Sequence, residues 1–469
     1  MEYDLTDEEI APIIPVVEIS NLSQHRQAWE ARSDTDDHHD VEYDETASST
    51  KKHVNGKVKH DLTPADIKLK QSESLAVEYA LKHKVDKAIE ERIKCLAYTR
   101  IVYGSSHWKH AQSIINLAED YINLKQYFAQ AEYHAETAKS IMLHGNHLAS
   151  SLEEKANLFT VLIQIYRILG QAATALKKYN EAEQALQKAD RISKELSKLE
   201  CVTDKECDHL DILLYQAMAR LYTKQKKHAL ASEKYDKVIE LMTKEFGNDS
   251  IQVMQANTEY GMLEQSKGKF ANHDKTIQLF LEAHSIATAI YKEGHPDLID
   301  TALNLSLAYA GNGWEEAEGS ALSYLEECLR SCTALYGPNH GKTLEVQDHL
   351  AKMYIRMGKM NDAMQILMSS LPSKMECFGD YSESVSESYK LMGSINLSEG
   401  NIEKALRAYK KCYTIEVVLH GKDHRKTKST LQTMEMLLSN PSLSQKFLLN
   451  KGDDLLKRPR FNSVVGRTK

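Results

Sequence analysis

Proline and cysteine are both scarce in this chain of 469 residues, and each scarcity excludes a class of structure. With only eight prolines, long stretches can run as uninterrupted helix. The seven cysteines are odd in number and irregularly spaced, which is not the pattern of a small domain held together by disulfides. The composition therefore indicates a helix-rich protein of a reducing compartment.

An excess of positive charge is also missing. The chain has 59 Lys and Arg residues against 67 Asp and Glu residues, a formal net charge of −8. A protein whose main partner is a nucleic acid is expected to be basic, because its affinity comes largely from Lys and Arg contacts to phosphates. We therefore expect no nucleic-acid partner.

No stretch has the pattern of a signal peptide or a membrane span. The chain opens on acidic residues, whereas a secretory signal begins with basic residues followed by an apolar run. The most apolar stretch, residues 158–176, contains Arg167 and has amphipathic helical spacing. Neither terminus matches a lipidation motif. These patterns predict a cytoplasmic protein with no transmembrane segment.

The first part of the chain is strongly acidic. Residues 1–50 hold 14 acidic residues against only Arg26 and Arg32, so residues 1–63 are predicted to form a disordered acidic arm. One apolar island, residues 10–17, interrupts it. The island is either an incidental patch or a short linear motif that orders on binding a partner.

The other end of the chain is basic. Residues 440–469 hold an excess of Lys and Arg and are predicted to be a mostly disordered C-terminal tail. A solvated tail and a contact with acidic protein, tubulin or a lipid surface both remain open. Between the two tails, residues 64–439 have the pattern of helix, short turn and helix throughout.

Small residues recur at fixed points of this helical region. In the second helix of each pair, a small residue is followed four positions later by a bulky one and, after three more, by another small or apolar one. These triplets are Ala182/Leu186/Ala189, Ala231/Tyr235/Val238, Ala321/Leu325/Cys328, Ala363/Leu367/Ser370 and Ala405/Tyr409/Cys412. Small residues allow two helices to approach closely, while large ones fill the gaps between neighbouring pairs.

The links between pairs repeat as well. Gly-x-x-His occurs at Gly104, Gly337 and Gly421, and Gly247 and Gly379 keep the same offset of 16 residues from the small residue of the second helix. A glycine is expected where a helix ends with positive φ. The link histidines are interpreted as turn and cap residues, because residues one repeat apart cannot converge on one metal.

These repeats predict an all-α fold, a tetratricopeptide-type α-solenoid of about eight helical hairpins with a C-terminal capping helix. A single hairpin cannot cover its own apolar face, so neighbouring hairpins must stack. The hairpins are expected near residues 64–104, 108–145, 153–199, 204–247, 249–294, 296–337, 341–379 and 383–421, with the capping helix near 425–439.

A candidate peptide groove follows from this architecture. The first helices of such hairpins line a concave face, and their side chains that point away from the core are available to a guest peptide. Asn side chains can hold an extended backbone, and basic side chains suit acidic partner residues. The candidates are Asn116, Glu119, Asn123, Arg220, Lys224, Asn304, Lys352 and Arg356.

Specific stretches resemble a known family. The unit of 42 residues with its Gly337-Pro338-Asn339-His340 link resembles the repeats of kinesin light chains. More closely, residues 97–109, 378–383 and 410–412 resemble the family of tetratricopeptide repeat protein 23 and its "-like" paralogue. The similarity spans about residues 75–437 and is absent from both tails.

The resemblance implies a non-enzymatic scaffold that binds proteins. It implies a place at the base of the primary cilium, where the scaffold supports Hedgehog (smoothened) signalling. The partners implied are the Ellis–van Creveld complex, an IQ-domain protein and an EF-hand protein. The "-like" paralogue implies instead an association with microtubules at the centrosome or cytoskeleton, and a kinesin-type cargo adaptor is the alternative function.

Motifs that suggest chemistry are weak. The stretch Gly337–Thr343 has three residues between its glycines, whereas a phosphate-binding loop needs four and a preceding strand. Cys201, Cys207 and His209 lack the spacing of a zinc site. Cys328 and Cys332 lie one helical turn apart, where cysteine serves as a small apolar residue. We therefore expect no catalytic residue, no metal site and no cofactor.

Overall fold

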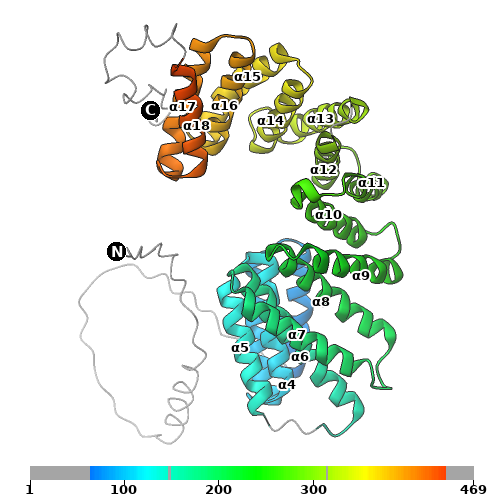
Figure 1. Cartoon of the computed structure of the whole chain (residues 1–469). Helices are drawn as coiled ribbons and strands as arrows, with labels where there is room; N and C mark the ends of the chain where they lie inside the picture. Colours follow the sequence, from blue (N-terminus) through cyan, green and yellow to red (C-terminus); the bar gives the residue numbers. More distant parts are fainter. Residues whose placement is uncertain (1–63, 146–148, 313–314, 440–469) are drawn as a thin grey trace, which may run out of the picture. The chain divides into compact units, whose positions relative to one another are not determined.

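The computed structural model describes residues 64–145, 149–312 and 315–439. In these residues the chain is helical and contains no strand (Figure 1). The helices are α2 Ala65–Leu81, α3 Val85–Tyr103, α4 Trp108–Asp120, η2 Tyr121–Lys125, α5 Phe128–His144, α6 Leu152–Ala175, α7 Tyr179–Leu196, α8 Asp204–Lys224, α9 His228–Phe246, α10 Ile251–Ser266, η3 Gly268–Phe270, α11 His273–Ile290, α12 Pro296–Asn312, α13 Glu315–Tyr336, α14 Gly341–Arg356, α15 Met360–Phe378, α16 Glu383–Ser398, α17 Ile402–His420 and α18 Arg425–Leu438. The predicted acidic arm, its apolar island and the basic tail lie outside the described residues.

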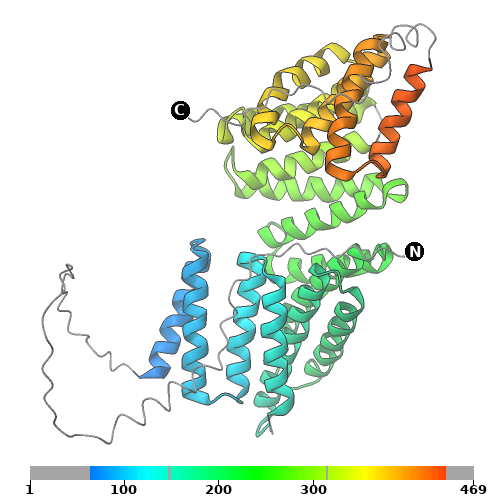
Figure 2. The same ribbon diagram turned by 90° about the vertical axis from the view of Figure 1, so that its left-hand side faces the viewer.

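Consecutive helices pair into hairpins. Each of the eight pairs from α2–α3 to α16–α17 packs closely, and α18 packs on α17 as a final single helix. Figure 2 shows the antiparallel helices of the first hairpins side by side. Neighbouring hairpins also touch through their first helices, as α4 with α6 and α6 with α8 do. The predicted all-α solenoid of eight hairpins with a capping helix is confirmed.

The predicted triplets lie in the core, where the second helix of a hairpin packs against its own first helix and against the next hairpin. Every member of the five triplets is buried. Ala182, Leu186 and Ala189 of α7 belong to one apolar cluster with Leu214 and Met218 of α8. The small residues in this register therefore do what their spacing predicts: they let the helices pack and leave room for bulky neighbours.

The link glycines have an unusual backbone. Gly104, Gly247, Gly379 and Gly421 have φ of 82 to 91° and ψ of 159 to 168°. The predicted positive φ is confirmed, but this region lies beyond the left-handed helical one and is essentially restricted to glycine. The four links therefore tolerate no other residue without strain.

The link histidines cap the helices that follow them. In His107, His295, His340 and His424, the ring Nδ1 accepts a hydrogen bond from the backbone N–H two residues further on, at 3.1 to 3.3 Å. Three of these rings stack on the tyrosine four residues before them: His107 on Tyr103, His295 on Tyr291 and His340 on Tyr336. The interpretation of His107, His340 and His424 as turn and cap residues is confirmed.

Helix α6 is the one helix of the described residues that is long and apolar enough to cross a membrane, by length and composition alone. Most of it is buried inside the fold. Ile163 and Ala173 pack in the apolar cluster shared with α7 and α8. Arg167 is buried and donates to Glu119 of α4 at 2.7 Å. These contacts are those of a core helix, in agreement with the amphipathic spacing of residues 158–176.

Burial lowers the pKa of four histidines, His110, His134, His284 and His349. A histidine of the unfolded chain takes up a proton near its ordinary pKa of 6.5, whereas the four buried rings stay neutral to lower pH. Their contribution to the free energy of unfolding is therefore fully present above pH 6.5 and is lost as the pH falls from there through the lowered pKa values of the folded chain. Each proton contributes a slope of up to ~1.4 kcal/mol per pH unit. We expect the urea midpoint to fall between pH 7.5 and pH 5.5, and to fall less in a variant with all four histidines changed to glutamine. An equal fall in both proteins would contradict this assignment.

Candidate peptide-binding face

The eight predicted groove residues all lie on or next to first helices of the hairpins. Asn116 and Glu119 lie on α4, Asn123 lies in the π-helical turn η2 that follows α4, Arg220 and Lys224 lie on α8, Asn304 lies on α12, and Lys352 and Arg356 lie on α14. All eight are exposed or partly exposed. Whether they bind a peptide stays a prediction, but their contacts divide them into three groups.

Four charged members form ion pairs with neighbouring hairpins. Three of these pairs join the first helix of one hairpin to the first helix of the next: Glu119–Arg167 at 2.7 Å, Arg220–Glu259 at 2.5 Å and Lys352–Glu387 at 2.7 Å. Arg356 pairs instead with Glu318 of the preceding second helix, α13, at 2.9 Å. The cations of this face are therefore offset by anions of the same chain, which weakens the predicted attraction for acidic partners.

Asn116 belongs to a chain of side-chain amides. The Nε2 of Gln112 donates both to Oδ1 of Asn116, at 2.9 Å, and to Oε1 of Gln164 on α6, at 2.7 Å. These hydrogen bonds thus connect the first helix of the second hairpin to the first helix of the third. Each amide still has donor or acceptor capacity free for the backbone of an extended peptide. We call Gln112, Asn116 and Gln164 the amide strip.

The amide strip leads into an open hollow of about 740 Å³ between α6 and α8. Gln164 belongs to both features. The polar side chains that line the hollow are Glu153, Asn157, Thr160 and Gln164 of α6, Lys205, Glu206 and His209 of α8, and Glu245 of α9. The hollow and the strip together form the candidate site.

The long link between α7 and α8 closes one side of this hollow. Cys201, Val202 and Thr203 of the link line it, and Thr203 caps α8 through a reciprocal pair of hydrogen bonds with Glu206. This link contains no glycine, whereas the links after α3, α9, α13, α15 and α17 each begin with one. Sequence reasoning placed no groove residue on α6, although the helical spacing of Asn157, Thr160 and Gln164 and the longer link both point to this place.

The remaining predicted residues make no polar contact within the described part of the chain. These are Asn123, Asn304 and Lys224. Asn304 lies several hairpins away from the amide strip, and Lys224 ends α8 at the turn into α9. The structure therefore ties Asn116, through Gln112, and Glu119, through Arg167, to helix α6, which lines the hollow, but it does not gather all eight residues into one site.

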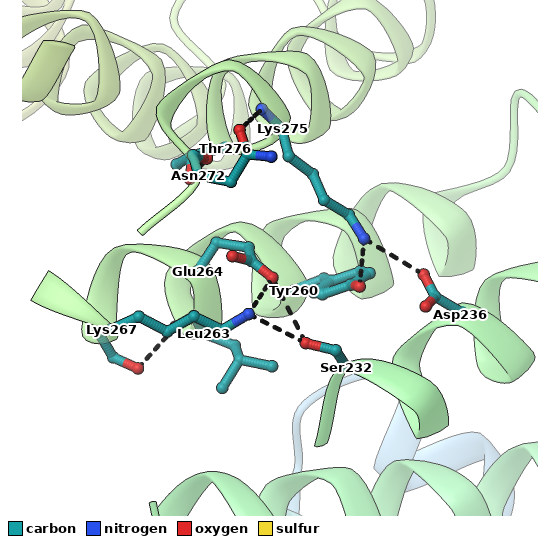
Figure 3. A network of polar contacts seen from close by, with 10 residues as sticks. Ser232, Asp236, Tyr260, Leu263, Glu264, Lys267, Asn272, Lys275 and Thr276 are labelled. Carbon is teal, nitrogen blue, oxygen red and sulfur yellow. Dashed lines mark hydrogen bonds and ion pairs between the residues drawn. The ribbon is translucent and has the colours of Figure 1, made fainter. Parts of the chain in front are cut away.

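A second polar network supports the turns of the middle hairpins (Figure 3). Lys267 donates to Glu264 at 2.5 Å and to Ser232 of α9 at 3.1 Å. Lys275 donates to the hydroxyl of Tyr260 at 2.5 Å and lies 3.6 Å from Asp236 of α9. These side chains are occupied in joining α9, α10 and α11, so the network has a structural role.

The motifs that suggested other chemistry take structural roles too. In Gly337–Thr343, the hydroxyl of Thr343 donates to the carbonyl of Gly337 at 2.8 Å, and Lys342 pairs with Asp300 at 2.8 Å. Cys328 and Cys332 are buried, and burial raises the pKa of the Cys328 thiol to about 12. Among the described residues, no group of His, Cys, Asp and Glu is arranged to hold a metal ion.

A stack of helical hairpins is the architecture of helical-repeat proteins, and the tetratricopeptide repeat proteins are one class of them. The family model of the tetratricopeptide repeat matches residues 163–196 and 386–416, within hairpins α6–α7 and α16–α17. The crystal structure of the apo form of RapI has the same kind of fold, with a TM-score of 0.55 and 12% identity. It covers 82% of this chain and 99% of the RapI chain.

Within that class, two relatives match this chain over most of their length. Tetratricopeptide repeat protein 23 of Homo sapiens is 32% identical over 383 residues, which are 82% of this chain and 84% of the relative. Tetratricopeptide repeat protein 23-like of Mus musculus is 28% identical over 419 residues, 89% of this chain and 90% of the relative. The chain belongs to the tetratricopeptide repeat protein 23 family. Such repeat arrays are generally interaction scaffolds without catalysis, so the chain has a protein-interaction role.

Proposed function

We propose that the chain is a non-enzymatic scaffold that binds an extended segment of a partner protein on the amide strip and in the hollow beside it. The observation that carries this proposal is the path of Asn116, Gln112 and Gln164 across two hairpins into the space between α6 and α8. Amide side chains can both donate to and accept from a peptide backbone, so they suit an extended guest.

Membership of the family supports a more specific form of the proposal. The scaffold acts at the base of the primary cilium and supports Hedgehog signalling with the Ellis–van Creveld complex, together with IQ-domain and EF-hand proteins. The support is the identity of about a third to tetratricopeptide repeat protein 23 over most of both chains. A microtubule-associated or kinesin-type cargo adaptor is the competing function.

Proximity labelling in ciliated cells tests this proposal. The variant Asn157→Arg/Thr160→Arg places two long cations in the hollow without breaking a hydrogen bond of the amide strip. We expect labelling of the Ellis–van Creveld proteins to fall about tenfold, the equivalent of ~1.4 kcal/mol of binding free energy. The matched control, Asn180→Arg/Gln187→Arg, changes two exposed neutral residues of α7 and is expected to label as the wild type does.

Localisation separates the two functions. Tagged wild-type protein is expected at the ciliary base and not in the pellet with microtubules. Pelleting with microtubules, without enrichment at the ciliary base, would overturn the ciliary proposal and favour the adaptor. Equal labelling by the hollow variant and its control would reject the hollow as the binding place.

A further inference from the structure

The hollow between α6 and α8 has an apolar floor. Leu196 of α7 and Leu210 of α8 line it and are buried. Ala156 of α6 and Val202 of the α7–α8 link also line it, and both pack against the same apolar cluster. The floor is therefore an extension of the core, and its side chains offer no hydrogen bond. It can receive the aliphatic part of a guest side chain but leaves a polar group without a partner.

The side chains around this floor carry more negative than positive charge. The carboxylates of Glu153, Glu206 and Glu245 stand against one lysine, Lys205, so three negative charges and one positive charge give a formal charge of −2 when histidine is counted as neutral. Hydrogen bonds from the backbone and the hydroxyl of Thr203 lower the pKa of Glu206, so this carboxylate stays charged at neutral pH. The hollow therefore attracts a cation.

Glu245 is the one of the three carboxylates that is mostly buried. Its side chain is only 12% exposed, whereas Glu153 and Glu206 are exposed residues. Its Oε1 lies 3.2 Å from Nδ1 of His209, a side chain that is itself 54% exposed. Its Oε2 is buried and accepts no hydrogen bond within the described part of the chain. A buried carboxylate oxygen without a donor costs free energy, and a guest that supplies a donor removes that cost.

The floor and Glu245 together select among guest side chains. An acidic side chain would meet like charge, and a purely apolar one would desolvate Glu245 further without supplying a donor. A basic side chain satisfies both features, because its stem covers the floor while its head supplies charge and donors. Arginine suits the hollow better than lysine, because a guanidinium can bind both oxygens of one carboxylate and is more weakly hydrated.

We propose that the partner segment carries an arginine, whose stem lies on the floor of the hollow and whose guanidinium binds Glu245. This inference rests on the proposed function, since it names the residue by which the guest is anchored. It reverses the expectation of an acidic guest, which came from basic candidates such as Arg220, Lys352 and Arg356. Each of those three is already paired with a carboxylate of the chain.

The chain has its own thiol for testing this anchor. Cys201 is exposed and lines the hollow, whereas Cys377 is exposed on α15, outside the hollow. The other five cysteines are buried. Each of the two exposed cysteines directly follows a glutamate in the sequence. Cys377 is therefore a matched control for a general attraction of cations by neighbouring charge.

Disulfide exchange on the full chain measures which side chain the hollow prefers. Small disulfides that carry a guanidinium, a urea of the same shape or a carboxylate react with each thiol in excess 2-mercaptoethanol, and peptide mass spectrometry gives the fraction modified. At Cys201 we expect the equilibrium constant of the guanidinium fragment to exceed that of the urea fragment about tenfold, with the carboxylate fragment lowest. At Cys377 the three fragments are expected to agree within about twofold.

Glu245→Gln keeps the shape of the side chain and removes its charge. This variant is expected to reduce the preference for guanidinium at Cys201 to less than about twofold. Glu240→Gln, at an exposed position of the same helix outside the hollow, is expected to leave the preference unchanged. Equal binding of the guanidinium and urea fragments at Cys201, the same preference at Cys377, or a preference that survives in Glu245→Gln would each overturn the proposal.

Disulfide exchange needs no partner protein, so its outcome separates this inference from the proposed function. Reduced partner labelling in Asn157→Arg/Thr160→Arg, with no preference for guanidinium at Cys201, would keep the hollow as the binding place and reject the arginine. A preference for guanidinium together with unchanged partner labelling in that variant would keep the cation site and reject the partner segment as its occupant.

Discussion

Replacing Lys374 by methionine is expected to lower the free energy of unfolding by about 3–5 kcal/mol, a large share of the stability of a typical domain. Lys374 lies on α15 and its side chain is fully buried. Its ammonium group donates to Asp348 of α14 and, at 2.8 Å, to Ser388 of α16, so one side chain joins three helices. The methionine variant leaves the carboxylate of Asp348 buried without its cation.

The pKa of Lys374 is lowered, because burial outweighs the attraction of Asp348. The charged pair is therefore a costly arrangement that is stable only when both partners are present. We expect Lys374→Met/Asp348→Leu to recover most of the stability lost by the single variant, since apolar residues of similar volume replace buried pairs well. Urea unfolding followed by circular dichroism measures both variants.

The exposed pair of Lys352 and Glu387 provides the control. Both side chains are more than a third exposed, at 39 and 46%, so solvent screens their attraction. Lys352→Met is expected to cost less than about 1 kcal/mol. Equal losses in Lys374→Met and Lys352→Met would show that burial of the first pair has no energetic consequence.

Gly170→Ala is expected to destabilise the third hairpin by about 1–3 kcal/mol. A Cβ atom at this position would lie 2.4 Å from Cγ and 2.6 Å from Cδ2 of Leu186 on α7. Leu186 is fully buried in the cluster shared by α6, α7 and α8, so it has no space into which to move. Overpacking of this kind forces either an unfavourable rotamer or a shift of the helices.

The same substitution at Gly319 should have the opposite sign. Gly319 lies in the interior of α13, and a Cβ atom there would meet no atom within 4 Å. Gly319→Ala is expected to stabilise the protein by about 0.5–1 kcal/mol, because glycine loses more conformational entropy in a helix than alanine does. Thermal midpoints of the two variants, measured side by side, test the contrast. Shifts in the same direction would contradict it.

Much of the fold is predictable because its repeats impose the same demand many times. A small residue recurs where two helices approach, and glycine recurs where the link needs its backbone conformation. The register even extends to Lys374, which continues the buried series of Ala363, Leu367 and Ser370 by a further helical turn. The sequence therefore indicates that Lys374 faces the core, but not that Asp348 and Ser388 accept hydrogen bonds from its buried ammonium group.

The candidate site was only partly predictable for a related reason. The spacing along one helix indicates which side chains point outward, and all eight predicted groove residues are at least partly exposed. It does not indicate that Arg220 faces Glu259, 39 residues away on the next first helix. The hollow beside α6 was missed because it depends on the path of the α7–α8 link, which no period of the sequence describes.

The helices, their pairing and the buried register can be predicted from the amino-acid sequence, because they depend on local spacing and on the short turns that join neighbours along the chain. The pairing of charges cannot be predicted in this way: the contact of Asp348 with Lys374, and the exposure of Lys177 and Lys226 without an ion pair among the described residues, follow from how the hairpins pack. The reason is that Coulomb attraction and desolvation depend on distances across the stack of hairpins, and those distances do not exist until the helices have packed.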